Sequence, residues 1–141
     1  MNRSAVYDLL RELGFEVEPL FFSDYPNDVK GAHEAISKAA LLIGPHGAGF
    51  ANLVALQPNT AVIEFHSANF QRIVYGRLAT VLGLKYNPIL VPEKDTVHTE
   101  ASRKAKREND QWRHRDITID LTILRESLVD VIEHLDSKGL W

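Results

Sequence analysis

The chain has 141 residues, enough for one domain with its own hydrophobic core and too few for two large domains. Hydrophobic residues make up 45% of it and charged residues 25%, the balance of an ordinary globular protein, and the formal net charge of −3 argues against broad binding of nucleic acid. The absence of cysteine excludes disulfides, thiolate metal sites and cysteine nucleophiles.

The first part of the chain is predicted to alternate between helix and strand. A helix is indicated by apolar residues at helical spacing, with Gly14 as its stop: Val6, Leu9, Leu10 and Leu13. Residues 15–20 alternate between apolar and charged, which is typical of a half-buried strand. Residues 23–28 are interpreted as a loop and helix start, followed by a second helix whose apolar side carries Val29, Ala32, Ile36 and Ala39.

The middle of the chain continues the alternation. Residues 40–43 form an apolar run that ends at Gly44, which is typical of a strand buried on both faces. A third helix is predicted over about 47–56 and a strand over 61–65. A longer helix is then expected from about Asn69 to Gly83, using Ile73, Val74, Leu78, Val81 and Leu82, before a weaker strand over 84–90.

The last third breaks this rhythm. Residues 91–116 are charged and poor in apolar residues, which predicts a mobile loop or a short exposed helix, and a closing helix is expected over 120–137. The basic run at 103–107 is flanked by acidic residues and is interpreted as a solvated face.

The alternation of strands and helices predicts an α/β fold, with a parallel sheet covered by helices on both faces, in one Rossmann-like domain over residues 1–141. Such a domain usually opens with a strand, whereas this sequence opens with a helix. We therefore expect the chain to be a fragment that lacks the first strand of the unit. No apolar run approaches the roughly 20 residues that span a bilayer, and Met1 does not lead into a signal peptide.

The turn at residues 44–49 carries the clearest chemical signal. Gly44, Gly47 and Gly49 lie where a strand becomes a helix, and glycine there permits positive φ and close approach of a ligand to the backbone. The first amides of the helix, near Ala48, Gly49 and Phe50, would form a phosphate site. Glycines at such a turn can also serve tight packing alone, but the polar His46 in its middle favours a ligand site.

Glu64 closes the strand after this turn. The dinucleotide-binding fold places an acidic residue about 20 residues after its glycine-rich turn to bind a ribose, and Glu64 lies at a similar distance from Gly44. Glu64 would serve equally well as a solvated strand end. The glycine spacing, G-x-x-G-x-G, differs from the G-x-G-x-x-G of nicotinamide-dependent enzymes, which disfavours an oxidoreductase.

Residues 42–53, followed by Pro58 and by Val62-Ile63-Glu64, resemble the signature of glycosyltransferase family 61. Phe50-Ala51 stands where the family more often has Leu-Thr, a change that leaves the turn intact. The resemblance covers nearly the whole chain but only the C-terminal half of such an enzyme, so an N-terminal domain would be missing.

The resemblance implies a GT-B architecture, an inverting and metal-independent transfer, and a nucleotide-sugar donor, expected to be a UDP-sugar. His46, Gly47, Ala48 and Gly49 would hold the diphosphate with support from Asn52, and Glu64 would hold the ribose. Tyr86 and His66 would face the same cleft. The acceptor would be a glycan or a glycoprotein.

Several properties stay open at this stage. The catalytic residues are unknown, with His46 as a candidate, and neither a metal nor a cofactor is predicted. His33, His98, His114 and His134 show no metal-like spacing and are expected to be solvated. The alternative function is a non-catalytic nucleotide-binding remnant or one half of a split enzyme. The compartment would be the Golgi or endoplasmic reticulum lumen in a eukaryote and the cytoplasm in a bacterium.

Overall fold

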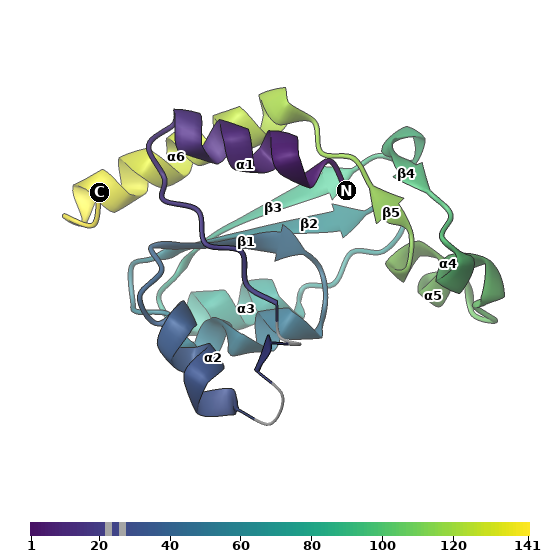
Figure 1. Ribbon diagram of the computed structural model, residues 1–141, viewed down its shortest axis with the longest axis horizontal. Coiled ribbons are helices and arrows are strands. Elements are labelled where there is room, and N and C mark those ends of the chain that lie inside the picture. The colour runs from purple at the N-terminus through teal and green to yellow at the C-terminus, as the bar shows by residue number, and fades with distance from the viewer. Residues whose placement is uncertain (22–23, 26–27) are drawn as a thin grey trace.

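The computed structural model describes residues 1–21, 24–25 and 28–141 (Figure 1). The part that builds the main sheet contains, in order, α1 (Arg3–Glu12), α2 (Val29–Ile36), β1 (Leu41–Pro45), the 3₁₀ helix η2 (Ala48–Ala55), β2 (Ala61–Ser67), α3 (Val74–Val81) and β3 (Lys85–Val91). The rest contains η3 (Glu93–Asp95), β4 (Thr96–Val97), α4 (Glu100–Lys104), α5 (Glu108–Arg113), β5 (Asp116–Ile117) and α6 (Leu121–Ser137).

The main sheet has the order β1-β2-β3, and both pairings are parallel. Helices α1 and α6 cover one face, whereas α2, η2 and α3 cover the other (Figure 1). The predicted α/β fold, a parallel sheet with helices on both faces, is therefore confirmed.

The two faces of the sheet follow from the alternation of side chains along β2. Ala61, Ile63 and Phe65 belong to the hydrophobic core under α1 and α6, while Val62 belongs to the core under α2, η2 and α3. Every residue of β2 is buried, because β2 is the central strand. The same alternation directs Glu64 toward the face that Val62 occupies.

The predicted ends of three helices agree with the structure. Gly14, with φ +96°, follows α1, and Gly83, with φ +69°, follows α3; this left-handed backbone favours glycine at a helix C-terminus. The Asp120 side chain accepts hydrogen bonds from the amides of Thr122 and Ile123 and so caps α6, the closing helix.

Residues 15–20 do not form the predicted strand. They run as irregular backbone from α1 on one face to α2 on the other, although Phe15 and Val17 still pack against the core. The alternation of apolar and charged residues correctly indicated half burial, but within the described residues this segment pairs with no strand. Of the predicted loop over 23–28, residues 23, 26 and 27 lie outside the described part of the chain.

Two helices and one strand are buried differently from the prediction, and the start of one helix and the type of another also differ. Val29 in α2 and Ile73, Val74 and Val81 around α3 were expected on apolar sides, but they are exposed. The helix expected from Asn69 begins later because Asn69 has φ +58° and the Phe70 amide closes a turn onto Ser67. The helix expected over 47–56 is a 3₁₀ helix. Strand β1 is only half-buried.

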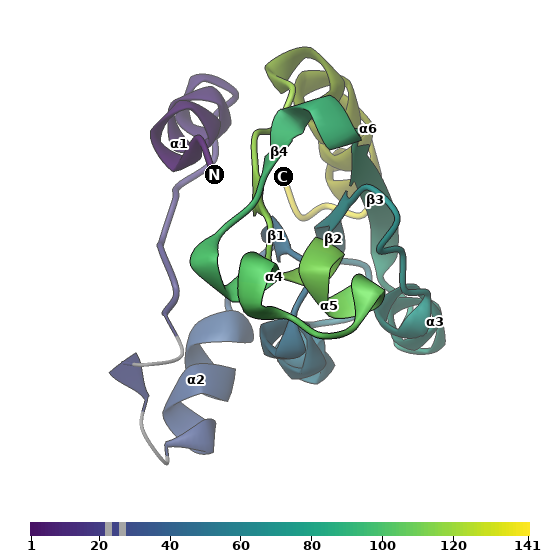
Figure 2. The same cartoon turned by 90° about the vertical axis from the view of Figure 1, so that its right-hand side faces the viewer.

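The charged stretch over 91–116 is more ordered than predicted. It forms α4, α5 and a short antiparallel ladder between β4 and β5 beside the carboxyl ends of the main strands (Figure 2). Trp112 is buried with Ala68 and Phe70, and its carbonyl accepts a hydrogen bond from Ser67 Oγ. The charged composition of the segment gave no sign of this contact, because the contact depends on a single buried tryptophan. None of the described helices has the length and apolar character needed to cross a bilayer.

Candidate functional site

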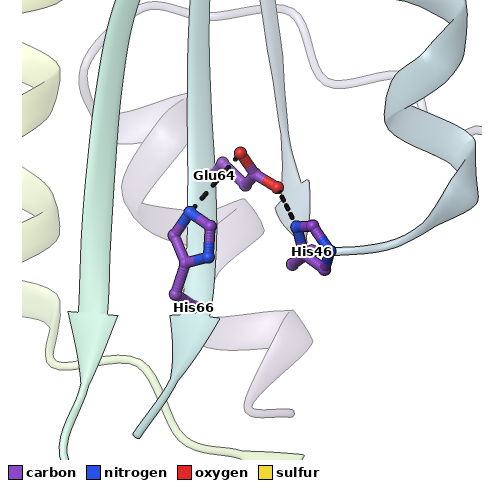
Figure 3. A group of neighbouring side chains, drawn as sticks. All are labelled: His46, Glu64 and His66. Carbon is purple, nitrogen blue, oxygen red and sulfur yellow. Dashed lines mark hydrogen bonds and ion pairs between the residues drawn. The ribbon is translucent and has the colours of Figure 1, made fainter. Parts of the chain in front are cut away.

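Two neighbouring strands bring His46, Glu64 and His66 together. In the parallel register Gly44 lies opposite Glu64, and His46 follows β1 on the face to which Glu64 and His66 point. An added Cβ at Gly44 would lie 3.7 Å from the Phe50 ring. Figure 3 shows the Glu64 carboxylate between the two imidazoles.

The carboxylate of Glu64 is fully buried, with 0% of the residue exposed, and its oxygens accept hydrogen bonds from two elements. His46 Nδ1 donates to Oε1 at 2.5 Å, and the Tyr86 hydroxyl donates to Oε2 at 2.5 Å. His66 Nε2 lies 3.4 Å from Oε2 and 3.2 Å from the Tyr86 oxygen. Glu64 therefore joins β1, β2 and β3 at one polar point within an apolar layer.

These contacts decide the charge of Glu64. Burial raises the pKa of its carboxyl, but hydrogen bonds from His66, Tyr86 and His46 outweigh burial, and the pKa lies below its usual value. Burial, followed by the hydrogen bond to Glu64, raises the pKa of the Tyr86 phenol well above its ordinary value. Glu64 is thus an anion and Tyr86 a neutral donor at physiological pH.

The Glu64 contact also fixes the chemistry of His46. A carboxylate only accepts, so Nδ1 carries the proton and Nε2 is the ring nitrogen left for a ligand. His46 lines a cavity of about 560 Å³ together with Gly49 and Arg115. The ring is packed between His66, Phe70 and Tyr75, at centroid distances of 5.4, 5.3 and 5.4 Å. This packing orients the imidazole.

The glycine-rich turn follows β1 at the same edge. The His46 amide donates to Phe65 O and the Phe50 amide to Gly47 O, so Phe50 has no free amide, contrary to the prediction. The amides of Ala48 and Gly49 have no hydrogen-bond partner in the described chain. Gly44, Gly47 and Gly49 do not have positive φ, so the glycines contribute open space and not a left-handed turn.

Asn52 is directed back onto the turn. Its amide nitrogen donates to Gly49 O at 3.0 Å, and its side-chain oxygen lies 3.1 Å from His33 Nε2. His33 was expected to be solvated, but it is half-buried and ties α2 to η2 through this contact. His134 is also half-buried and donates to Asn59 O, whereas His98 and His114 are exposed as predicted.

Sequence reasoning missed Arg115. Its guanidinium lies 3.7 Å over the Trp112 ring and donates to Thr96 Oγ1 at 3.0 Å. It borders the same cavity as His46, although the two residues come from distant parts of the chain. No sequence signal distinguished Arg115 from the other charged residues of this stretch.

The donor atoms of His46, Glu64 and His66 lie within 4.8 Å of one another, so these residues are the group of the described chain that could hold a metal ion. A metal there would have to displace the hydrogen bonds to Glu64. His66 Nδ1 is buried without a hydrogen-bond partner among the described residues.

The part of the chain that contains the glycine-rich turn is similar to known proteins. Residues 1–63 match the sequence model of the family described as Glycosyltransferase 61. A β-1,2-xylosyltransferase of Arabidopsis thaliana is 39% identical over 59 residues, which cover 42% of this chain and 11% of the relative. A β-1,2-xylosyltransferase of Oryza sativa subsp. japonica is 34% identical over 65 residues, 46% of this chain and 12% of the relative.

The chain thus spans about a tenth of the length of the curated relatives it matches. The family match ends directly before Glu64 but contains the strand, the glycine-rich turn and His46. The first 63 residues of the chain are therefore similar to glycosyltransferase family 61.

Proposed function

We propose that this chain is the donor-binding part of an inverting, metal-independent glycosyltransferase, corresponding to the C-terminal half of a GT-B enzyme. The donor is a nucleotide sugar, in our proposal a UDP-sugar, and the acceptor is a glycan or a glycoprotein. The observation that carries the proposal is the His46–Glu64 hydrogen bond of 2.5 Å beside the free amides of Ala48 and Gly49.

The proposed diphosphate site combines three kinds of donor. The amides of Ala48 and Gly49 would donate to phosphate oxygens, and Gly47 and Gly49 would admit those oxygens close to the backbone. His46 Nε2 would contact the diphosphate while Nδ1 is held by Glu64. When the acceptor oxygen bonds to the sugar and the bond from the sugar to the diphosphate breaks, these groups stabilise the charge that develops on the leaving diphosphate.

In this proposal the main role of Glu64 is not to bind the ribose directly. Its carboxylate is buried and both oxygens already accept hydrogen bonds, so a ribose contact requires one of these partners to move. We propose that Glu64 acts mainly as a positioning residue, which fixes the tautomer and orientation of His46. Asn52 supports the site by holding the Gly49 carbonyl.

The test is calorimetric titration of UDP into the chain, its His46→Ala variant and the matched control His114→Ala, whose histidine is exposed. Loss of one hydrogen bond to a charged group costs about 1.5–3 kcal/mol, so UDP affinity should fall at least about tenfold in His46→Ala and stay unchanged in His114→Ala. Equal affinity of the His46→Ala variant and wild type would falsify the assignment of the turn.

Further measurements distinguish this proposal from the alternative functions. UDP binding should be unchanged in EDTA and should exceed binding of NAD, which the glycine spacing disfavours. A chain that binds UDP but transfers no sugar from a UDP-sugar to any glycan would match the alternative, a nucleotide-binding remnant or one half of a split enzyme.

A further inference from the structure

The outer edge of β1 presents unpaired backbone. The Ala40 carbonyl accepts from the Ala61 amide, and the His46 amide donates to Phe65, so both face β2. Backbone groups of successive strand residues point to opposite edges, and those of Leu41, Ile43 and Pro45 therefore point away from β2. In the described ranges β1 pairs with β2 alone, which leaves this edge without a ladder.

A groove runs along this edge. The cavity of about 560 Å³ is lined by every residue of β1, from Leu41 to Pro45. Val6 and Leu10 of α1 form one wall, and Ile36 and Ala39, at the end of α2, form the other. Residues 17–21 also line the groove, and they belong to the irregular segment that runs from α1 to α2 (Figure 2). The groove is therefore apolar on both faces and has a row of backbone donors and acceptors along its inner side.

The two edges of the main sheet differ in a way that bears on this groove. Strand β3, at the opposite edge, carries Lys85 and Pro88, and charge and proline are features by which proteins protect a terminal strand. Strand β1 also contains a proline, Pro45, but it carries no charged residue and begins with Leu41, Leu42 and Ile43, an apolar run typical of an internal strand of a parallel sheet. In the structure, however, β1 is only half-buried, unlike an internal strand of a parallel sheet.

We propose that this groove binds one extended apolar peptide strand, running parallel to β1 and inserted between β1 and residues 17–21. The amides of Leu41 and Ile43 would donate to it, and the carbonyls of Leu41, Ile43 and Pro45 would accept from it. Its side chains would alternate between the wall formed by α1 and the wall formed by α2. Such strand addition gives affinity through main-chain hydrogen bonds and specificity through the side-chain pockets.

In this proposal the strand comes from the additional sequence of a longer enzyme similar to the matched glycosyltransferases. The matched xylosyltransferases extend far beyond the 59 and 65 residues that they share with this chain, so they contain ample sequence for such a strand. The parallel direction follows from the described pairings and from the helices that cover both faces, which is the environment of parallel sheets.

The experiment tethers a strand to the chain. A designed strand of about six Val, Ile and Thr residues is fused to Met1 through a flexible loop of about four residues. Met1 lines the groove together with Pro45, the last residue of β1, so the tethered strand runs parallel to β1. The matched control has proline at alternate strand positions, which removes the donors and leaves the length unchanged.

The readout is amide hydrogen exchange followed by NMR, which does not depend on nucleotide binding. Relative to the proline control, exchange at Leu41 and Ile43 should slow at least about tenfold. Leu42, which already faces β2, should change much less, and the melting temperature should rise. The proposal is overturned if Leu41 and Ile43 exchange equally in both fusions. It is also overturned if the unfused chain forms a dimer that protects these amides, because a second copy would then be the occupant.

Discussion

Glu64 is the residue whose environment departs most from what its sequence position suggests. In the sequence it resembles a solvated acid at the end of an apolar strand, yet it lies in the middle of β2 (Ala61–Ser67), where the parallel register places it opposite Gly44 and where His46 and Tyr86 contact it. A buried carboxylate is tolerated only when its oxygens are hydrogen-bonded, and here each oxygen has a donor. The proposed chemistry of His46 depends on this arrangement, because Glu64 determines which imidazole nitrogen faces the ligand.

The depressed pKa of Glu64 predicts a pH-dependent stability. A group whose pKa is lower in the folded than in the unfolded state stabilises the fold above its unfolded pKa, 4.5 for this carboxyl, and loses that contribution as pH falls through the folded pKa. Glu64→Gln should therefore lower the free energy of unfolding by about 1.5–3 kcal/mol at pH 7. Urea unfolding at a series of pH values would measure the difference.

The gap between wild type and Glu64→Gln should close as the pH falls below 4.5. Glu126→Gln, at an exposed position of α6, is the matched control and should change stability little at any pH. A gap that stays constant or widens on acidification would show that the charge of Glu64 is not the source of the effect.

At the scale of elements, much of the architecture was predictable because local signals and tertiary packing agree. The apolar spacing of α1 and α6 and the strands around the glycine-rich turn appear as the sequence indicates. The 15–20 segment and the beginning of α3 were not predictable, because they depend on a strand neighbour and on the positive φ of Asn69. For the site, the sequence located His46 and the turn, whereas the contacts among Glu64, Tyr86 and His66 depend on the register of three strands.

The N-cap of α6 gives a prediction at this scale. Asp120 accepts from the amides of Thr122 and Ile123, at 2.8 and 3.3 Å, at the beginning of the helix that covers β2 and β3. Asp120→Ala should destabilise the chain by about 1 kcal/mol, measured by chemical unfolding. Asp136→Ala, near the C-terminus of the same helix, is the control: removing a negative charge there should leave stability unchanged or raise it. Equal losses in both variants would contradict the capping role.

At the scale of the whole molecule, the charged segment over 91–116 lies at the carboxyl ends of the main strands, where parallel α/β sheets bind ligands. Beyond Val91, the last residue of β3, which belongs to the larger core, its hydrophobic contact with the rest is a small cluster of Trp112, Ala68 and Phe70, separate from the two large cores. The segment also supplies Arg115 to the cavity that His46 lines. Its stability therefore bears on the shape of the candidate site while remaining partly independent of the sheet.

This separation predicts local unfolding in Trp112→Ala. Trp→Ala in a single cooperative core costs about 3–5 kcal/mol, but here the loss should be confined to opening of the segment. Amide exchange should accelerate over α4 and α5 while β2 keeps its protection. Trp141→Ala, which removes a half-exposed ring that contacts Phe15, is the control and should leave the exchange of α4 and α5 unchanged. If β2 loses protection together with α4 and α5, the segment is a cooperative part of the domain, and Arg115 is then as firmly placed beside the cavity as His46.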